Sequence, residues 1–306
     1  MAHQPILPSS VADPVGSDRI ERACIAEFSR RLRQVRQLYE AAIPEPVRIG
    51  NAEGDYYYLS PELLQSTLEG LGAQVTRILL ENGQGNLWFI EAGIVPAYEK
   101  GTGAQYANLS VQSSTYKAAR GNLTTLLSSP EYQRRLAFLR GRLAFELDGY
   151  SNKVKAHMSR VLQDGLATGK NPRVVAKELQ TQIGIDYRDA EFISRTEIPG
   201  ALRAARMQEA DQAAADLGIR TLELHLSACS PTTRPTHYAR MGTLHTTGEQ
   251  RAWWERDGNR FRCKCSTVTT LVDAQDKPLT PGVVTKALAI KAANPLPERP
   301  GRNPKA

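Results

Sequence analysis

The segment from residue 229 to residue 265 holds the side chains of this 306-residue chain that are best suited to metal or nucleophilic chemistry. Three of the four cysteines and two of the five histidines lie there: Cys229, Cys263, Cys265, His237 and His245. Thiolates and imidazoles are preferred zinc ligands, and a structural zinc site usually has four of them. The three cysteines and His237 therefore form a candidate structural zinc site, with His245 in reserve. A metal there would stabilise a segment that has little core of its own.

The spacing of these residues leaves other interpretations open. Structural zinc sites favour about two to four residues between paired cysteines, whereas only Lys264 separates Cys263 from Cys265. The alternatives are free, buried cysteines beside a hydrogen-bonded histidine, or a disulfide that involves Cys229. A Cys–His nucleophile would need an orienting group and a pair of oxyanion donors, and the sequence identifies neither. We therefore expect no catalytic residues and no enzymatic activity.

Two strands are expected to flank the Cys/His segment. Residues 221–226 alternate in the manner of a half-buried strand, and residues 266–272 are rich in β-branched side chains. Together they would form a small sheet with the Cys/His residues at its open end. Trp253 and Trp254 are expected to pack over this sheet.

Polar side chains are expected to hold this module to the helices that precede it. Arg234, beside His237, is expected to pair with Glu197 or Glu255, because a thin module depends on polar cross-links. Ser194 and Glu197 have the spacing of a capping box. The triplet at residues 195–197 is therefore expected to have a structural role, with its charged residues also bonding into the C-terminal sheet.

Most of the remaining chain has the spacing of apolar residues that is typical of amphipathic helices. Helices are expected over residues 18–42, 63–82, 104–127, 130–148, 150–165 and 186–218. Pro199 lies inside the last of these and predicts a kink or a break. Gly169 is expected to end one helix, and Asn171 with Pro172 to begin the next. Residues 87–97 are expected to form a strand or a short buried turn.

The predicted fold class is α+β and predominantly α-helical. Both ends of the chain are rich in proline, which predicts a flexible arm at the N-terminus and a disordered, basic tail at the C-terminus. Residues 130–272 are expected to form one domain. The expected parts are the arm (1–17), a helical N-terminal region (18–129), the helices of the domain (130–218), its small Cys/His module (219–272) and the tail (273–306).

Composition limits the classes of partner. The formal net charge of +7 favours an anionic partner, such as nucleic acid or an acidic protein surface. The N-terminal residues lack the pattern of a secretory leader. No apolar stretch approaches the length that is needed to cross a bilayer. We therefore expect a protein of a reducing cytoplasm that has no membrane partner.

The order of these motifs resembles the phage head-morphogenesis family, the Mu F-like minor head proteins. A helix that follows the turn at residues 165–169 carries the Arg-Thr-Glu triplet, and an Arg-x-x-His motif and a closing Cys-x-Cys follow. The resemblance covers roughly residues 130–272. Its signature residues in this chain are Arg195, Thr196, Glu197, Arg234, His237, Gly242, Cys263 and Cys265.

The resemblance implies a minor capsid protein in the head of a tailed phage or prophage. Its implied partners are the portal protein, the major capsid or scaffolding protein, and packaged DNA, which it would contact through phosphates without reading sequence. The chain departs from the family where Cys229 or Ser230 replaces a usual acidic residue, which weakens Cys229 as a metal ligand. The closing Cys-Arg-Cys of the family is here Cys-Lys-Cys, which preserves the charge.

Two other functions remain open. One is a zinc-dependent or Cys–His enzyme, nuclease- or toxin-like, that is attached to a head protein. The other is a DNA-binding protein with no role in the virion. Loss of turnover with intact particle assembly would favour the first, and absence from purified particles would favour the second.

Overall fold

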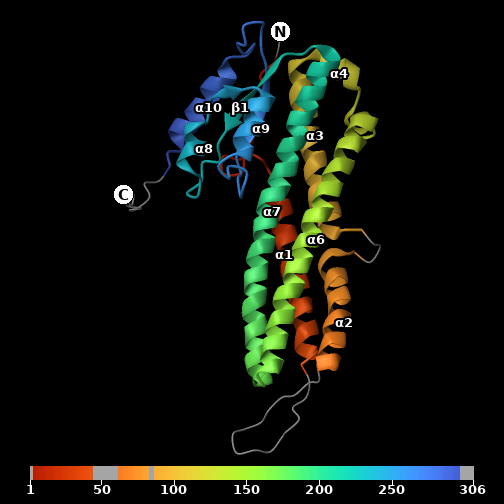
Figure 1. Cartoon of the computed structure of the whole chain (residues 1–306). Coiled ribbons are helices and arrows are strands. Elements are labelled where there is room, and N and C mark those ends of the chain that lie inside the picture. The colour runs from red at the N-terminus through yellow and green to blue at the C-terminus, as the bar shows by residue number, and fades with distance from the viewer. Residues whose placement is uncertain (1–2, 44–60, 83–85, 297–306) are drawn as a thin grey trace, which may run out of the picture. The chain divides into compact units, whose positions relative to one another are not determined.

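The computed structural model describes residues 3–43, 61–82 and 86–296. Its helices and strands follow one another as α1 (Asp18–Ala41), α2 (Pro61–Leu80), the π-helical turn η1 (Ile90–Ile94), α3 (Val95–Gln112), α4 (Ser114–Arg120), α5 (Leu123–Leu127), α6 (Pro130–Ala167), α7 (Pro172–Leu217), β1 (Thr221–Leu226), α8 (Pro235–Ala239), β2 (Leu244–His245), α9 (Thr247–Glu255), β3 (Ser266–Leu271) and α10 (Gly282–Ala293) (Figure 1). The predicted fold class is confirmed, because helices dominate and a small sheet lies near the C-terminus.

The chain forms two compact units that are interleaved along the sequence. Unit 1 comprises Met1–Ile20, Ile94–Leu136 and Arg195–Ala306, and unit 2 comprises Glu21–Gly93 and Ala137–Ser194. The division falls within α1, α6 and α7, so each of these helices contributes to both units. The consecutive segments expected from the sequence therefore differ from the compact units, because long helices carry the chain from one unit to the other.

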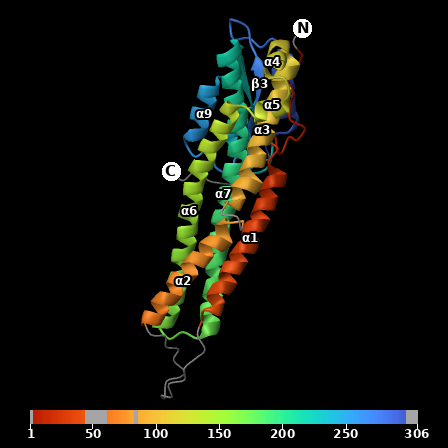
Figure 2. The same cartoon turned by 90° about the vertical axis from the view of Figure 1, so that its right-hand side faces the viewer.

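Unit 2 is a helical bundle. In both views, α1 and α2 lie alongside the unit-2 stretches of α6 and α7 (Figures 1 and 2). Phe28 packs its ring against Trp88, Phe89 and Tyr150, with centroid distances of 4.7, 5.3 and 5.8 Å. These buried aromatic rings supply much of the apolar area that stabilises the bundle.

Unit 1 contains the sheet, in the antiparallel order β2-β1-β3. The strands β1 and β3 pair along their whole length, from Thr221 opposite Leu271 to Leu226 opposite Ser266. Both predicted strands are confirmed, and β2 is an addition. The amide side chain of Gln105 on α3 donates to Thr269 Oγ1 of β3 at 2.8 Å, which joins this helix to the sheet.

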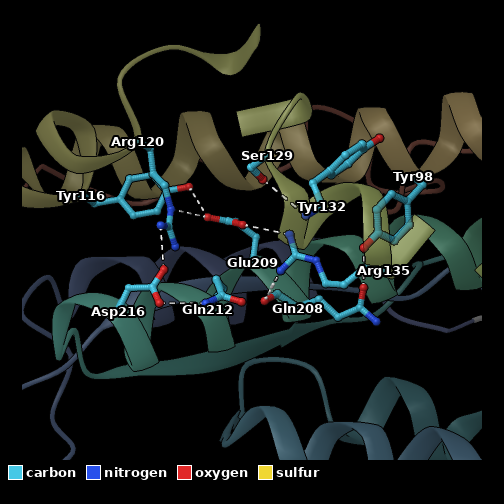
Figure 3. Close-up of polar contacts among 10 residues, drawn as sticks. All are labelled: Tyr98, Tyr116, Arg120, Ser129, Tyr132, Arg135, Gln208, Glu209, Gln212 and Asp216. Atoms are coloured by element: carbon cyan, nitrogen blue, oxygen red, sulfur yellow. Dashed lines mark hydrogen bonds and ion pairs between the residues drawn. The ribbon is translucent and has the colours of Figure 1, made fainter. Parts of the chain in front are cut away.

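A buried ion-pair network joins α4, α6 and α7 within unit 1 (Figure 3). The Glu209 carboxylate is buried and accepts hydrogen bonds from Tyr116 Oη at 3.0 Å and Arg120 Nε at 2.9 Å. Its other oxygen accepts from Arg135 Nη2 at 3.2 Å. Arg120 also pairs with the exposed Asp216 at 2.8 Å. Two guanidinium groups therefore compensate the buried carboxylate.

The expected flexible arm is packed over the part that the structure describes, residues 3–17. The Ile6 N–H donates to Asn108 Oδ1 at 2.9 Å, and the Val11 carbonyl accepts from the Cys229 N–H at 3.0 Å. Its prolines prevent a helix, but they also lower the entropy lost on packing an extended segment. The described part of the arm is therefore hydrogen-bonded to other segments of unit 1.

The expected disordered tail is structured over residues 273–296. Helix α10 lies within it, and Val283 and Ala287 are buried in the same cluster as Leu224 of β1. The basic, proline-rich composition of the segment conceals this short apolar run, which has enough surface to pack on the sheet. The remaining tail, residues 297–306, lies outside the described residues.

Several predicted helix boundaries differ from the structure. The helix expected over 104–127 is divided into α3, α4 and α5, because the Ser113 and Asn122 side chains cap new helices at Tyr116 N and Thr125 N. The segment expected as a strand or turn at 87–97 is mostly helical, and the two helices expected over 130–165 are the single helix α6.

The predicted connection between α6 and α7 is confirmed. Gly169 has a φ of +63°, which suits glycine at a helix end, and the Asn171 side chain accepts from the Arg173 N–H at 2.9 Å.

Helix α7 then begins at Pro172 and continues through Pro199 without a break. The proline removes one backbone donor, but packing on both sides keeps the helix continuous.

Candidate metal centre and basic cavity

Three of the four predicted ligands come together in unit 1. His237 lies on α8, and Cys263 and Cys265 lie just before β3. The His237 Nδ1 atom is 3.4 Å from Cys263 Sγ and 3.5 Å from Cys265 Sγ. The three ligand atoms lie within 4.8 Å of one another, and all three side chains are buried. This cluster can hold a metal ion.

A hydrogen bond to Asn259 orients the His237 ring. The His237 Nε2 atom is 3.1 Å from Asn259 Oδ1, and the Asn259 amide donates to the Trp253 carbonyl at 2.9 Å. Because the amide nitrogen is committed to a carbonyl, the amide oxygen must face the imidazole and accept from Nε2–H. The Nδ1 lone pair is then directed at the two sulfur atoms. Metal-binding histidines are typically oriented by such a second hydrogen bond.

The backbone of the Cys-x-Cys segment is held by α7. The Arg203 guanidinium donates to the Cys263 carbonyl at 2.7 Å and to the Cys265 carbonyl at 3.3 Å. Between Phe261 and Cys263, the residue Arg262 has a φ of +48°, a left-handed conformation that is uncommon for a side chain of this size. The Arg203 side chain thus fixes the backbone from which both sulfur atoms reach His237.

The two thiols differ in acidity. The hydrogen bond from the Cys265 thiol lowers the pKa of Cys263 well below its usual value, with further help from the positive charge of Arg203. The same bond and burial raise the pKa of Cys265. Cys263 is therefore the thiol that loses its proton more readily, and a bound metal would favour the loss of both protons.

The other predicted ligands lie elsewhere. Cys229 is half-buried, and its sulfur atom is 3.7 Å from both the Ser227 carbonyl and Met241 Sδ. His245, the reserve ligand, hydrogen-bonds to Thr243 Oγ1 at 2.7 Å. All four cysteines are free thiols, so the alternative of a Cys229 disulfide does not hold. The candidate set is thus corrected from four protein ligands to three.

A cavity of about 380 Å³ adjoins the cluster. All three candidate ligands line it, together with basic and hydroxyl side chains. The basic side chains are Arg195, Arg234, Arg262 and Lys264, and the hydroxyl side chains are Ser230, Thr232 and Thr233. No described residue that lines this cavity is acidic. The lining therefore presents positive charge and hydrogen-bond donors beside the metal ligands.

Most residues of the family signature meet at this cavity. Arg195, at the lining, is followed by Thr196, whose Oγ1 accepts from the Arg262 N–H at 3.3 Å. The Glu197 carboxylate lies 3.8 Å from the guanidinium of Arg260. Gly242 differs, because it forms a turn with a φ of +88° that leads into β2.

Arg234 has partners other than those expected from the sequence. Its guanidinium donates to the carbonyls of Gly258, Asn259 and Phe261, at 2.8, 2.7 and 3.2 Å. These bonds hold the loop from which Asn259 hydrogen-bonds to the candidate ligand His237. The expected ion pair with Glu197 or Glu255 is replaced because the loop offers three carbonyls within reach of one guanidinium.

The tryptophans pack where they were expected. The Trp253 ring lies 5.1 Å from the ring of His225 on β1 and 4.6 Å from that of His237. Both Trp253 and Trp254 are buried in one cluster with Cys263 and Cys265. Water is thereby kept from one side of the candidate metal centre.

Sequence reasoning did not find Asn259, Arg203 or the conformation of Arg262. Asn259 lies in an Asp-Gly-Asn turn, where asparagine is common for local reasons. Arg203 lies on α7, far from the cysteines along the chain. The sequence offered only an indirect signal for Asn259: a histidine that binds a metal usually has a second polar partner for its other ring nitrogen.

The fold and the site define a predominantly helical protein whose α+β module carries a buried His/Cys/Cys cluster beside a basic cavity. Residues 156–268 match the family described as Phage Mu protein F like protein. The match supports the family assignment that the resemblance predicted, over this region of the chain. The comparisons found no significant match to a curated protein or to a solved structure. Among the helices of the described residues, none combines the length and apolar character that a membrane span requires.

Proposed function

We propose that this protein is a minor head protein that takes part in assembly of the head of a tailed phage or prophage and remains in the virion. The observation that carries this proposal is the family match over residues 156–268, which includes the candidate metal ligands and all the residues that line the cavity. The family itself indicates phage head morphogenesis. In this proposal the protein is an assembly component and not an enzyme.

Its partners would be the portal protein, the major capsid or scaffolding protein, and packaged DNA. The net charge of +7 supports contact with DNA phosphates. Such contact would be independent of sequence and would weaken as the salt concentration rises, because counterions are released on binding.

The His237, Cys263 and Cys265 cluster would hold zinc. The donor set fits, because two sulfur atoms and an imidazole nitrogen are borderline-soft ligands, and the imidazole is already oriented. When bound, the ion would link α8 to the start of β3, which stabilises a module made of short elements.

Quantitative mass spectrometry of purified particles tests the head function. We expect the protein in few copies per particle, and particle yield should fall when the C263S variant replaces the natural protein. The matched control is C229S, which removes a thiol outside the cluster and should assemble normally. Absence of the protein from particles would overturn the proposal.

A second function, zinc-dependent phosphodiester hydrolysis, is favoured by one observation: three protein ligands leave a coordination position for water. However, the described lining contains no carboxylate that could act as a general base. Turnover of DNA that disappears in H237A while particles still assemble would favour the enzyme over the assembly protein.

A further inference from the structure

We propose that the metal's fourth coordination position opens into the basic cavity and binds an oxyanion of the phosphate class. This inference rests on the proposed zinc site. It goes further by giving the site a ligand, so that the site is a binding centre as well as a structural link.

The first step is the incomplete ligand set. His237, Cys263 and Cys265 all line the cavity, and no other cysteine, histidine, aspartate or glutamate among the described residues does so. The sulfur atom of Cys229 lies against Ser227 and Met241 instead. Zinc is almost always at least four-coordinate in proteins. The fourth ligand must therefore enter through the cavity.

The second step is charge. Zinc held by two thiolates and a neutral imidazole carries no net charge, so the field at the open position is set by the surrounding side chains. The arginines at positions 195, 234 and 262 keep their charge at any physiological pH. Lys264 also lines the cavity and forms an ion pair with Asp18. Because no acidic side chain among the described residues lines the cavity, the lining favours an anion.

The third step is the kind of anion. Guanidinium groups and hydroxyls are donors that match the several acceptor oxygens of a phosphate group. The volume of about 380 Å³ exceeds that of a single halide ion and allows a phosphate that is attached to a larger group. Free phosphate and the phosphate of a nucleic acid share this chemistry.

The fourth step is rigidity. The left-handed backbone at Arg262, with a φ of +48°, costs conformational energy, and such strain is typically retained where a site requires it. The Thr196 hydroxyl fixes this backbone by accepting from the Arg262 N–H. The backbone of Arg262 is therefore fixed beside the cavity before any ligand binds.

Cobalt substitution tests the proposal in the full chain. With Co²⁺ in place of zinc, thiolate ligands give a charge-transfer band, and the d–d bands report the fourth ligand. We expect inorganic phosphate to change the d–d bands saturably, whereas chloride at equal ionic strength should not. A 5′-phosphorylated oligonucleotide and its unphosphorylated form, added separately, distinguish nucleic acid from free phosphate as the source.

The variants R195Q and R262Q should weaken phosphate binding about tenfold or more, because each removes a charged donor. Both should keep the charge-transfer band, which shows that the metal centre is folded. The control R256Q changes an exposed arginine outside the cavity and should bind phosphate normally. A missing charge-transfer band would refute the metal site itself. An intact band with no response to phosphate, or an equal response to chloride, would overturn the proposed oxyanion site.

Discussion

At His237, one hydrogen bond decides which ring nitrogen faces the thiols. Asn259 Oδ1 accepts from Nε2–H and leaves Nδ1 free to bind a metal. We expect N259L to lower zinc affinity by roughly 10- to 100-fold, because outer hydrogen-bond partners contribute about this much. Competition with a coloured zinc chelator measures the affinity.

The matched variant is N259D, which keeps an oxygen acceptor for the imidazole. It should bind zinc about as tightly as the natural protein, since a carboxylate serves the same purpose in many zinc sites. Equal affinity in N259L and the natural protein would show that Asn259 has no part in orienting the ligand.

A second histidine predicts a pH dependence of stability. Burial lowers the pKa of His225 to about 3, compared with about 6.5 in an unfolded chain. Between these values the unfolded chain takes up a proton that the folded protein does not, so stability falls as the pH decreases through this window. From pH 7 to pH 5 the loss is about 2 kcal/mol.

The H225Q variant removes this titration and keeps a polar group beside Gln250, the partner of His225 Nδ1 at 3.1 Å. Urea denaturation at pH 7 and pH 5 should show that the natural protein loses about 2 kcal/mol more than the variant. The comparison cancels contributions that both proteins share, including any loss of metal. If the free energy of unfolding fell equally with pH in the natural protein and in H225Q, His225 would not be buried in its neutral form.

At the scale of elements, the Glu209 network holds α4, α6 and α7 of unit 1 together (Figure 3). Replacing the carboxylate by E209Q leaves Arg120 and Arg135 without their shared counter-charge. Because breaking a buried ion pair is strongly destabilising, we expect a loss of about 3–5 kcal/mol in the free energy of unfolding. Chemical denaturation provides the measurement.

The control for this prediction is D216N, which removes the exposed partner of Arg120 in the same network. Exposed ion pairs contribute little, so its cost should stay below about 1 kcal/mol. Similar losses in the two variants would mean that burial does not determine the strength of these pairs.

At the scale of the whole molecule, distant parts of the chain complete unit 1. Removal of residues 1–12 would delete the backbone bonds that Ile6 and Val11 make to Asn108 and Cys229. At about 1 kcal/mol for each bond, and with the packing of Leu7 also lost, we expect a destabilisation of about 2–4 kcal/mol. Thermal unfolding would detect it as a lower Tm. As a control, removal of only residues 1–3 should leave the Tm unchanged. An unchanged Tm after the longer deletion would instead support the prediction that the N-terminal arm is flexible.

The sequence by itself determined the features that depend on neighbouring residues. The alternation of residues 221–226 and the β-branched run after Cys265 predicted both main strands, and Gly169 with Asn171 predicted the junction of α6 and α7. The order of the motifs predicted the family. These signals are local, because side-chain period, caps and left-handed turns act within a few residues.

Only the tertiary structure decided which of the candidate ligands share a site. Cys229 is one of three cysteines in the same segment, yet it faces Met241, whereas Cys263 and Cys265 face His237. Arg203 and Asn259 position the cluster from α7 and from a turn, and neither has a spacing signal. Such contacts join residues that are far apart along the chain, and their geometry depends on packing that no local pattern encodes.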